Sequence, residues 1–259
     1  MNIILLHPDE VRSSSVILHD RRAEHIRKIL GAKEGDRLRV GIIDGPMGSA
    51  LVLGLSRHEV RLRVNCQDAP PVKIGTDLIL ALPRPIMLKR VLAQAAAMGV
   101  GRIMLINARR VEKSFFQASL LQPDRIQTAL LQGLEQAMDT RLPVVSIHPR
   151  FRPFVEDQLP AIAVAYPLRL LGHPPAAAGS KLTSQAITGL HAPAHAHVTA
   201  KRQLLAVGPE GGWVDFEVER FRQQGFNLFS PGPRILRVDT AVAVLLALAE
   251  AGHHQGHQG

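Results

Sequence analysis

The stretch TDLILALPRPIMLKRVLAQAAAMGVGRIMLINA, residues 76–108, decides the fold class of this chain. Its two ends are short apolar runs of the kind found in buried strands, and residues 85–98 between them repeat apolar side chains at helical spacing. The helix is expected to bury one stripe of side chains, namely Leu88, Val91, Leu92 and Ala95. A strand, a helix and a second strand in this order predict an α/β fold with a mainly parallel sheet and helices on both faces.

The same alternation continues toward the C-terminus. A second helix is predicted over 123–138, and a third is expected to have Asp215 as its N-cap and Gly225 just past its end. Further strands are predicted at PVVSIH (143–148), AIAVAY (161–166), QLLAVGPE (203–210) and FNLFSPG (226–232). Residues 172–200, which are rich in alanine, proline, glycine and histidine, are expected to form an irregular excursion between two strands.

The first 70 residues follow another pattern, which predicts a small β-barrel. Five β-like runs are NIILLH (2–7), SVILH (15–19), DRLRVGIID (36–44), SALVLGLS (49–56) and EVRLRVNC (59–66). A short helix between the second and third runs is expected to turn Ala23, Ile26 and Ile29 inward. Its Arg21, Arg22, Arg27 and Lys28 are expected to face water or a phosphate backbone.

The linker DAPPVKIG (68–75) suggests where the domains meet, because two prolines and a glycine interrupt both patterns. We therefore predict an N-terminal domain at 1–72, a second domain at 73–251 and a disordered tail at 252–259. No signal peptide is recognised, and the apolar run Ala241–Ala249 is too short to span a bilayer.

The charge favours a polyanionic partner. Lys and Arg number 31 against 22 Asp and Glu, and residues 76–150 hold 10 basic and 5 acidic groups. RNA, DNA and an acidic membrane all remain possible, as does a basic surface that only aids solubility. The single cysteine, Cys66, excludes a disulfide framework and suits a reducing cytoplasm. No metal site is predicted, because His191, His195 and His197 have no carboxylate or cysteine beside them.

Two segments could bind a ligand, because each follows a predicted buried strand, where open α/β sheets bind ligands. They are AVGPEGGW (206–213) and FSPGPRILRVDTAV (229–242). Gly208, Gly211 and Gly212 would let the backbone approach a ligand closely. Neither segment has the spacing of a phosphate loop or a dinucleotide fingerprint, so those nucleotides are disfavoured.

Together the two segments resemble a known signature. GPEGGW at 208–213, followed by PGPRILRVDTA at 231–241, is similar to the signature of the RsmE family of small-subunit ribosomal RNA methyltransferases, within the SPOUT superfamily. The stretches at 95–114 (AAAMGVGRIMLINARRVEKS) and 133–143 (GLEQAMDTRLP) resemble other parts of that family. The stretch at 23–45 (AEHIRKILGAKEGDRLRVGIIDG) is similar to its PUA-like opening.

The resemblance implies a trefoil-knotted α/β domain behind a PUA-like barrel, a homodimer, and methylation of a uridine at N3 in 16S ribosomal RNA. It implies S-adenosylmethionine as cofactor. By position, the cofactor residues would be Leu82, Pro83, Gly208, Pro209, Glu210, Gly211, Gly212, Leu228, Pro231, Gly232, Ile235, Leu236 and Arg237. The chain departs from the family at Ala97, where a glutamate is common, and at Val238 and Asp239, where the family commonly has threonine and glutamate.

Three residues are the catalytic candidates. The N3 position of uracil carries a proton at neutral pH, so a group must accept or bias that proton. Glu210 is expected to be the base, Asp239 to orient a neighbour as a permanent anion, and Arg237 to stabilise negative charge on the uracil oxygens. The structural alternatives are that Glu210 binds loop amides, that Asp239 caps a helix, and that Arg237 pairs with Asp239.

The predicted RNA contacts near the cofactor loops are Arg84, Lys89, Arg109, Arg110 and Lys113, with Arg110 and Lys113 on one face if their turn is helical. Phe115, Phe116 and Trp213 could stack on a base or lie in the core. Arg21, Arg22 and Arg27 would grip the RNA backbone at a distance. Three alternatives stay open: a non-catalytic RNA-binding or ribosome-assembly protein, an inactive relative, and a small-molecule enzyme that uses another nucleotide.

Overall fold

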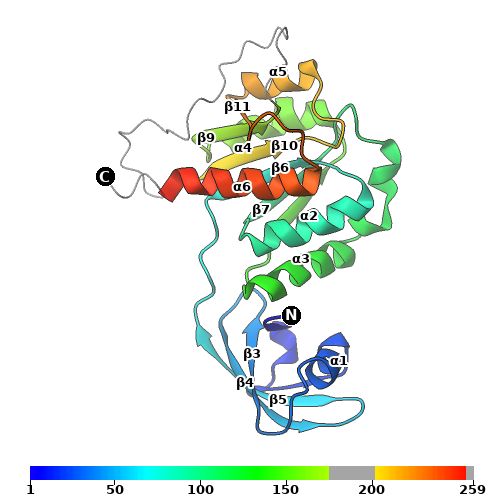
Figure 1. Ribbon diagram of the computed structural model, residues 1–259, viewed down its shortest axis with the longest axis vertical. Coiled ribbons are helices and arrows are strands. Elements are labelled where there is room, and N and C mark those ends of the chain that lie inside the picture. The colour runs from blue at the N-terminus through cyan, green and yellow to red at the C-terminus, as the bar shows by residue number, and fades with distance from the viewer. Residues whose placement is uncertain (175–201, 255–259) are drawn as a thin grey trace. The chain divides into compact units, whose positions relative to one another are not determined.

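The computed structural model describes residues 1–174 and 202–254 (Figure 1). The chain forms two compact units. Unit 1 comprises Met1–Val72 and Leu130–Leu142, and unit 2 comprises Lys73–Ala129 and Pro143–Gly259. Helix α3 (Pro123–Ala137) therefore begins in unit 2 and ends in unit 1. No feature of the sequence had pointed to this second segment of unit 1.

Unit 1 contains a five-stranded sheet in the order β1-β3-β4-β5-β2. The five strands lie where the β-like runs predict them, at Ile4–Leu6 (β1), Ser15–Leu18 (β2), Arg37–Ile42 (β3), Met47–Leu55 (β4) and Val60–Asp68 (β5). β1 pairs with β3 in parallel, and the other three pairs are antiparallel. A short 3₁₀ helix, Pro8–Glu10, connects β1 with β2.

Helix α1 (Arg21–Lys28) covers one face of this sheet. Its Ala23 and Ile26 lie in the same buried cluster as alternate residues of the strands, such as Val40 and Leu62. The prediction that Ile29 also points inward is wrong, because the helix ends at Lys28 and the Ile29 side chain is 71% exposed. Gly31 follows with a φ of +59°, a left-handed conformation that suits a glycine after a helix end.

Unit 2 contains a six-stranded sheet in the order β11-β9-β10-β6-β7-β8, and every pair in it is parallel. This confirms the predicted parallel α/β fold. The strands are Thr76–Ala81 (β6), Arg102–Ile106 (β7), Val144–His148 (β8), Leu168–Gly172 (β9), Gln203–Val207 (β10) and Asn227–Phe229 (β11).

The helices of unit 2 pack on this sheet. Helix α2 (Pro85–Ala97) buries the predicted stripe of Leu88, Val91, Leu92 and Ala95. Helix α6 (Val238–His254) packs beside α2 and also touches β6 and β10 (Figure 1). Helix α5 (Asp215–Gln223) contacts the helical segment Pro153–Gln158, which continues directly into α4 (Leu159–Ala163). Two 3₁₀ turns, Lys113–Gln117 and Ser119–Leu121, precede α3.

Two expectations for unit 2 need correction. The predicted strand at 161–166 is wrong, since residues 161–163 end α4, and the strand in this region is β9. A short apolar run is ambiguous between helix and strand, and here Leu159 and Ala163, four residues apart, are buried while Val164 is 81% exposed. The N-cap of α5 is Val214, one residue before the predicted Asp215.

Some predictions fall outside the described residues. They concern the irregular segment from residue 175 onward, with His191, His195 and His197, and the last residues of the tail, 255–259. Among the described residues, no helix has both the length and the apolar character needed to cross a bilayer.

Candidate cofactor and RNA site

The predicted cofactor loops leave the sheet of unit 2 at its carboxyl edge. Leu82 and Pro83 follow β6, and Gly208 follows β10. These two strands are neighbours, with Val207 opposite Leu80, so their loops start side by side. The third loop follows β11, which β9 separates from β10, and it leads back to α6 beside α2. The parallel sheet thus brings the predicted loops to one edge.

The Glu210 carboxylate joins the first two loops. Its Oε1 accepts a hydrogen bond of 3.1 Å from the backbone N–H of Arg84, the residue before α2. The Arg84 side chain makes no capping bond of its own, so a residue 126 positions away supplies an acceptor at this helix start. The second oxygen of Glu210 has no hydrogen-bond partner among the described residues, and the side chain is exposed.

The glycine loop is a tight turn held by an arginine. The Gly212 N–H donates to the Pro209 carbonyl at 2.8 Å, and Gly212 has a φ of +71°. The guanidinium of Arg110 donates to the Gly211 carbonyl. A Cβ at Gly211 would lie 2.9 Å from Cδ of Arg110. Gly211 therefore packs against the Arg110 side chain, whereas its sequence context suggests that it faces open space for a ligand.

Gly208 and Trp213 are packed together below this loop. A Cβ at Gly208 would lie 3.2 Å from the Trp213 ring. Trp213 is 4% exposed and packs edge-on against Phe221, with ring centroids 5.1 Å apart. Trp213 is therefore a core residue, and the prediction that it could stack on a base is not supported. Its indole Nε1 is buried without a partner in the described part of the chain, which leaves an unsatisfied donor beside the loop.

The loop before α6 contains the third group of predicted cofactor residues. Ser230 Oγ donates to the Gly232 carbonyl at 2.9 Å, and Gly232 has a φ of +137°. Ile235 is 85% exposed, and the Arg237 side chain is also exposed. Leu228 and Leu236 are half-buried, and Pro231 is exposed.

Asp239 lies in the first turn of α6, and its side chain is 14% exposed. Its Oδ2 lies 3.9 Å from Nη1 of Arg90 on α2, and its Oδ1 accepts from the Thr240 N–H at 2.9 Å. Among the described residues its basic partner is thus Arg90, and the alternative pairing of Asp239 with Arg237 is not observed. Sequence reasoning missed Arg90, since its only signal is an exposed position next to Lys89 on α2.

The five predicted RNA contacts of unit 2 are exposed, namely Arg84, Lys89, Arg109, Arg110 and Lys113. Lys113 begins a 3₁₀ turn that Arg110 precedes, so the two do not share a helical face. The Arg109 N–H donates at 2.6 Å to Glu217 Oε1, and the Val214 N–H donates at 3.0 Å to its Oε2. Glu217 is buried and was not singled out in the sequence, yet it fixes the loop after β7 to the start of α5.

The predicted RNA contacts of unit 1 are mostly engaged in internal bonds. Arg21 forms a two-bonded ion pair with Glu135, at 2.6 and 3.0 Å. The prediction that Arg22 faces water is wrong, because Arg22 is 7% exposed and pairs with Glu10 at 2.6 Å and Asp20 at 2.8 Å. The hydrogen bond from Arg22 lowers the pKa of Glu10. Arg27 donates to three carbonyls, of Ala23, Ser56 and Arg57.

A second polar cluster lies at the amino edge of the same sheet. Asp77 Oδ2 accepts from the Tyr166 hydroxyl at 2.5 Å and from Arg202 at 2.6 Å, and its Oδ1 accepts from the Arg102 N–H at 2.8 Å. The Arg202 guanidinium also lies over the Tyr166 ring. Burial, together with the hydrogen bond to Asp77, raises the pKa of Tyr166 to about 12. No group of three or more His, Cys, Asp or Glu side chains suited to a metal occurs in the described ranges.

Comparison with known proteins gives a consistent picture. The RNA methyltransferase domain family matches residues 70–250. A relative from Treponema pallidum named ribosomal RNA small subunit methyltransferase E is 28% identical, over 98% of this chain and 92% of its own. Two solved structures have the same fold. A ribosomal RNA small subunit methyltransferase E from Neisseria gonorrhoeae, bound to S-adenosyl methionine, has a TM-score of 0.69 at 18% identity, covering 97% of both chains. A methyltransferase from Legionella pneumophila with bound SAM has a TM-score of 0.70 at 21% identity, covering 96% of this chain and 97% of its own.

Proposed function

Because the chain belongs to the RNA methyltransferase family, we propose that it methylates N3 of a uridine in 16S ribosomal RNA, with S-adenosylmethionine as the methyl donor. The name of the Treponema relative and the SAM-bound structures support the substrate and the cofactor. The observation that carries the proposal in this chain is the exposed Glu210 carboxylate, which joins two strand-end loops at the carboxyl edge of the sheet and keeps one oxygen unpaired.

The strand-end loops fit the cofactor in the kind of donor they offer. The backbone N–H groups of Glu210 and Gly211 have no partner among the described residues, and both residues are exposed. The adenine ring and the carboxylate of S-adenosylmethionine both have acceptor atoms that such donors can bind. The proposed cofactor residues are Leu82, Pro83, Gly208, Pro209, Glu210, Gly211, Gly212, Leu228, Pro231, Gly232, Ile235, Leu236 and Arg237. When bound, the cofactor supplies an electrophilic methyl group to a nucleophile held in line with it.

Glu210 accepts the proton from N3 of uracil in this proposal. Its Oε1 is occupied by the Arg84 N–H, which orients the carboxylate and leaves Oε2 for the substrate. Arg237 is exposed and unpaired in the described part of the chain, so its guanidinium is free to stabilise the negative charge that spreads onto the uracil oxygens. Asp239 is a positioning residue that does not touch the substrate itself. It lies near Arg90 and accepts a hydrogen bond from the Thr240 N–H in the first turn of α6.

RNA contacts and assembly complete the proposal. Unit 2 binds RNA through Arg84, Lys89, Arg109, Arg110 and Lys113, all of which are exposed. Unit 1, with its sheet forming a PUA-like barrel, is a second RNA-binding domain. In this proposal the domain of unit 2 is trefoil-knotted and forms a homodimer. A dimer interface would cover the apolar residues Ile86 and Ile235, which are 69% and 85% exposed. The protein acts in the cytoplasm, during ribosome biogenesis.

The test is methyl transfer to defined RNA. The purified chain is incubated with S-adenosylmethionine and with small ribosomal subunits, or free 16S RNA, from cells that lack the gene. Nucleoside analysis is expected to find one N3-methyluridine per RNA molecule. Binding of S-adenosylhomocysteine and RNA without any methyl transfer would instead indicate a non-catalytic RNA-binding or ribosome-assembly protein. If another nucleotide raises the melting temperature of the chain and S-adenosylhomocysteine does not, the whole assignment is rejected.

A further inference from the structure

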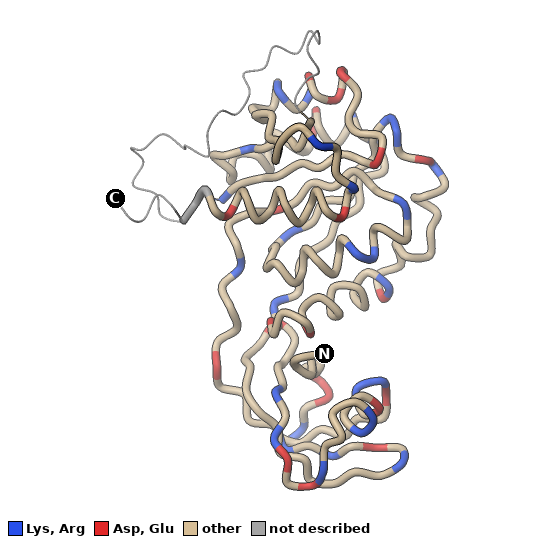
Figure 2. Tube along the Cα trace, viewed as in Figure 1, with Lys and Arg blue, Asp and Glu red and all other residues tan. Residues whose placement is uncertain are grey.

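The sheet of unit 1 has four arginines on its outer face. Along β3 and β5 the buried residues alternate with exposed ones, and Val40, Leu62 and Val64 belong to the core. Because neighbouring side chains of a strand point to opposite faces, the exposed residues between them lie on the other side of the sheet from α1. We call Arg37, Arg39, Arg61 and Arg63 the arginine face; the charge along the chain is drawn in Figure 2.

The strand register arranges these side chains in rows. Arg37 pairs with Leu51 of β4, and Leu51 pairs with Arg63 of β5. The two arginines therefore stand two strand spacings apart, about 10 Å, while successive arginines on one strand are about 7 Å apart. In the next row Arg39 pairs with Ser49, which pairs with Asn65. The outer face thus carries an array of donors, in which the register shift between Val52 and Gly54 places Arg61 opposite Gly54.

Few carboxylates neutralise this array. Glu59 lies 3.5 Å from Arg61, and Arg39 donates at 2.9 Å to the thioether sulfur of Met138, which is a weak acceptor. In the described part of the chain, Arg37 and Arg63 form neither ion pairs nor hydrogen bonds through their side chains. The arginine face therefore presents positive charge that few carboxylates of the described residues offset, and a polyanion is the partner that would neutralise it. The arginines of α1 differ in this respect, since Arg22 is already paired with two carboxylates.

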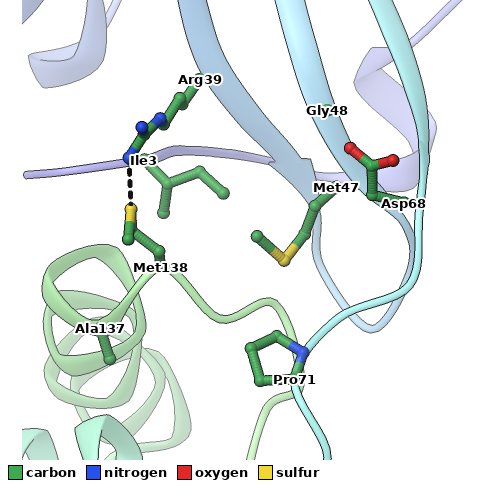
Figure 3. A pocket seen from close by; sticks show the side chains of 8 residues that line it. All are labelled: Ile3, Arg39, Met47, Gly48, Asp68, Pro71, Ala137 and Met138. Atoms are coloured by element: carbon green, nitrogen blue, oxygen red, sulfur yellow. Dashed lines mark hydrogen bonds between the residues drawn. The ribbon is translucent and has the colours of Figure 1, made fainter.

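A cavity of about 390 Å³ opens at the Arg39 end of this face (Figure 3). Its apolar lining includes Ile3, Met47 and Pro71, and Figure 3 shows Arg39 and Asp68 on opposite sides of it. An apolar floor with one donor group and one acceptor group at the rim suits an unpaired nucleobase, which has a flat apolar face and a polar edge. A duplex could not insert a base there without opening.

We propose that the arginine face binds single-stranded RNA, with phosphates on Arg37 and Arg63 and one unpaired base in the cavity between Arg39 and Asp68. This surface replaces α1 as the RNA-contacting side of unit 1. The inference rests on the proposed function, in that RNA is taken as the substrate, but it concerns a site that performs no chemistry.

The phosphate contacts are tested by salt dependence. The full-length chain and its Arg37→Ala/Arg63→Ala variant are titrated with fluorescein-labelled oligouridylate at several salt concentrations. The log–log slope of affinity against salt should become shallower by about 0.7 for each lost contact with a single strand. The variant Lys28→Ala/Lys33→Ala removes the same charge from exposed positions outside the arginine face, in and just after α1, and should keep the wild-type slope. Equal slopes in the wild type and the arginine variant would overturn the proposal.

The base site is tested by filling the cavity. Ala137 lines it, and Ala137→Phe should weaken binding of the single strand about tenfold, the loss of one stacked base, while Ala137→Ser should leave affinity unchanged. If Ala137→Phe lowers the melting temperature, the variant Asp68→Ala is tested in its place, because Asp68 is exposed. It should weaken binding of the single strand by a smaller factor. Single-strand affinity that is unchanged in a folded variant would remove the base from this cavity.

Affinity for S-adenosylhomocysteine is measured in parallel and is expected to be the same in every variant. A wild-type chain that binds no RNA at all would refute the proposed function as well. If the wild type binds and the variants bind equally, only the present inference fails.

Discussion

The two edges of the six-stranded sheet use polar residues in opposite ways. At the amino edge, the Asp77 carboxylate accepts three hydrogen bonds, and its partners Tyr166 and Arg202 also bind each other. At the carboxyl edge, Glu210 accepts one bond from a loop N–H and otherwise faces solvent, and the Trp213 indole N–H has no acceptor among the described residues. A satisfied cluster stabilises the fold, whereas the exposed Glu210 carboxylate keeps an oxygen that remains available to a ligand. Substitutions at the two edges should therefore separate stability from activity.

The largest effect is expected from Glu210→Gln. Glutamine keeps an oxygen that can accept from the Arg84 N–H, so the loop should stay in place, but the amide cannot take a proton. The single-turnover transfer rate should fall by about 10² or more, while calorimetry should find the affinity for S-adenosylhomocysteine nearly unchanged.

The matched variant at the same edge is Asp239→Asn. It weakens the interaction with Arg90, so RNA affinity or melting temperature should fall together with the rate. If Glu210→Gln keeps its rate and Asp239→Asn alone loses it, then Asp239 is the base and our assignment is wrong.

Asp77→Asn tests the amino edge in the opposite sense. The amide loses the charge that faces Arg202 and has one acceptor oxygen where the carboxylate has two. We expect the free energy of unfolding to fall by about 2 kcal/mol, measured by urea denaturation. The affinity for S-adenosylhomocysteine should not change, and a clear loss of it would mean that the two edges are not independent.

Gly208→Val sharpens the comparison within the carboxyl edge. The new side chain would press on the Trp213 ring, which is buried and has little room to move. We expect at least about tenfold weaker binding of S-adenosylhomocysteine, equivalent to about 1.4 kcal/mol.

Gly211→Ala is the control for this substitution, because its Cβ would meet the long side chain of Arg110, which can shift. It should cost much less affinity. Equal losses at both glycines would show that the loop responds to any added atom and not to the packing of Trp213.

The smallest effect is expected from Tyr166→Phe, which removes one buried hydroxyl and should cost about 1 kcal/mol at neutral pH. The pKa of Tyr166 is raised from 10 to about 12 in the folded chain, so folding favours the neutral phenol. Its contribution is therefore complete below pH 10 and is lost as the pH rises through about 12. Unfolding free energies measured across this window should decline less steeply for the variant, and parallel curves would contradict the assignment.

Local patterns determined most of the secondary structure of this protein. Alternation along β3 and β5, and the apolar stripe of α2, each depend on a repeat that the chain itself displays, so they were predictable. The same reasoning failed at residues 161–166, where a short apolar run fits either a helix or a strand, and at Ile29, where the helix ended one residue too early to bury it.

The loops of the site could be predicted, because GPEGGW and PGPRILRVDTA follow buried strands of a parallel sheet and resemble a family signature. What each side chain does there could not. Glu210 meets Arg84 across 126 residues, and Arg110 meets Gly211 across 101. Arg22 was expected in water and lies buried between carboxylates of two different segments. A periodic pattern specifies which face of an element is apolar, but the partner of a polar group depends on chain segments that only the tertiary fold brings within hydrogen-bonding distance.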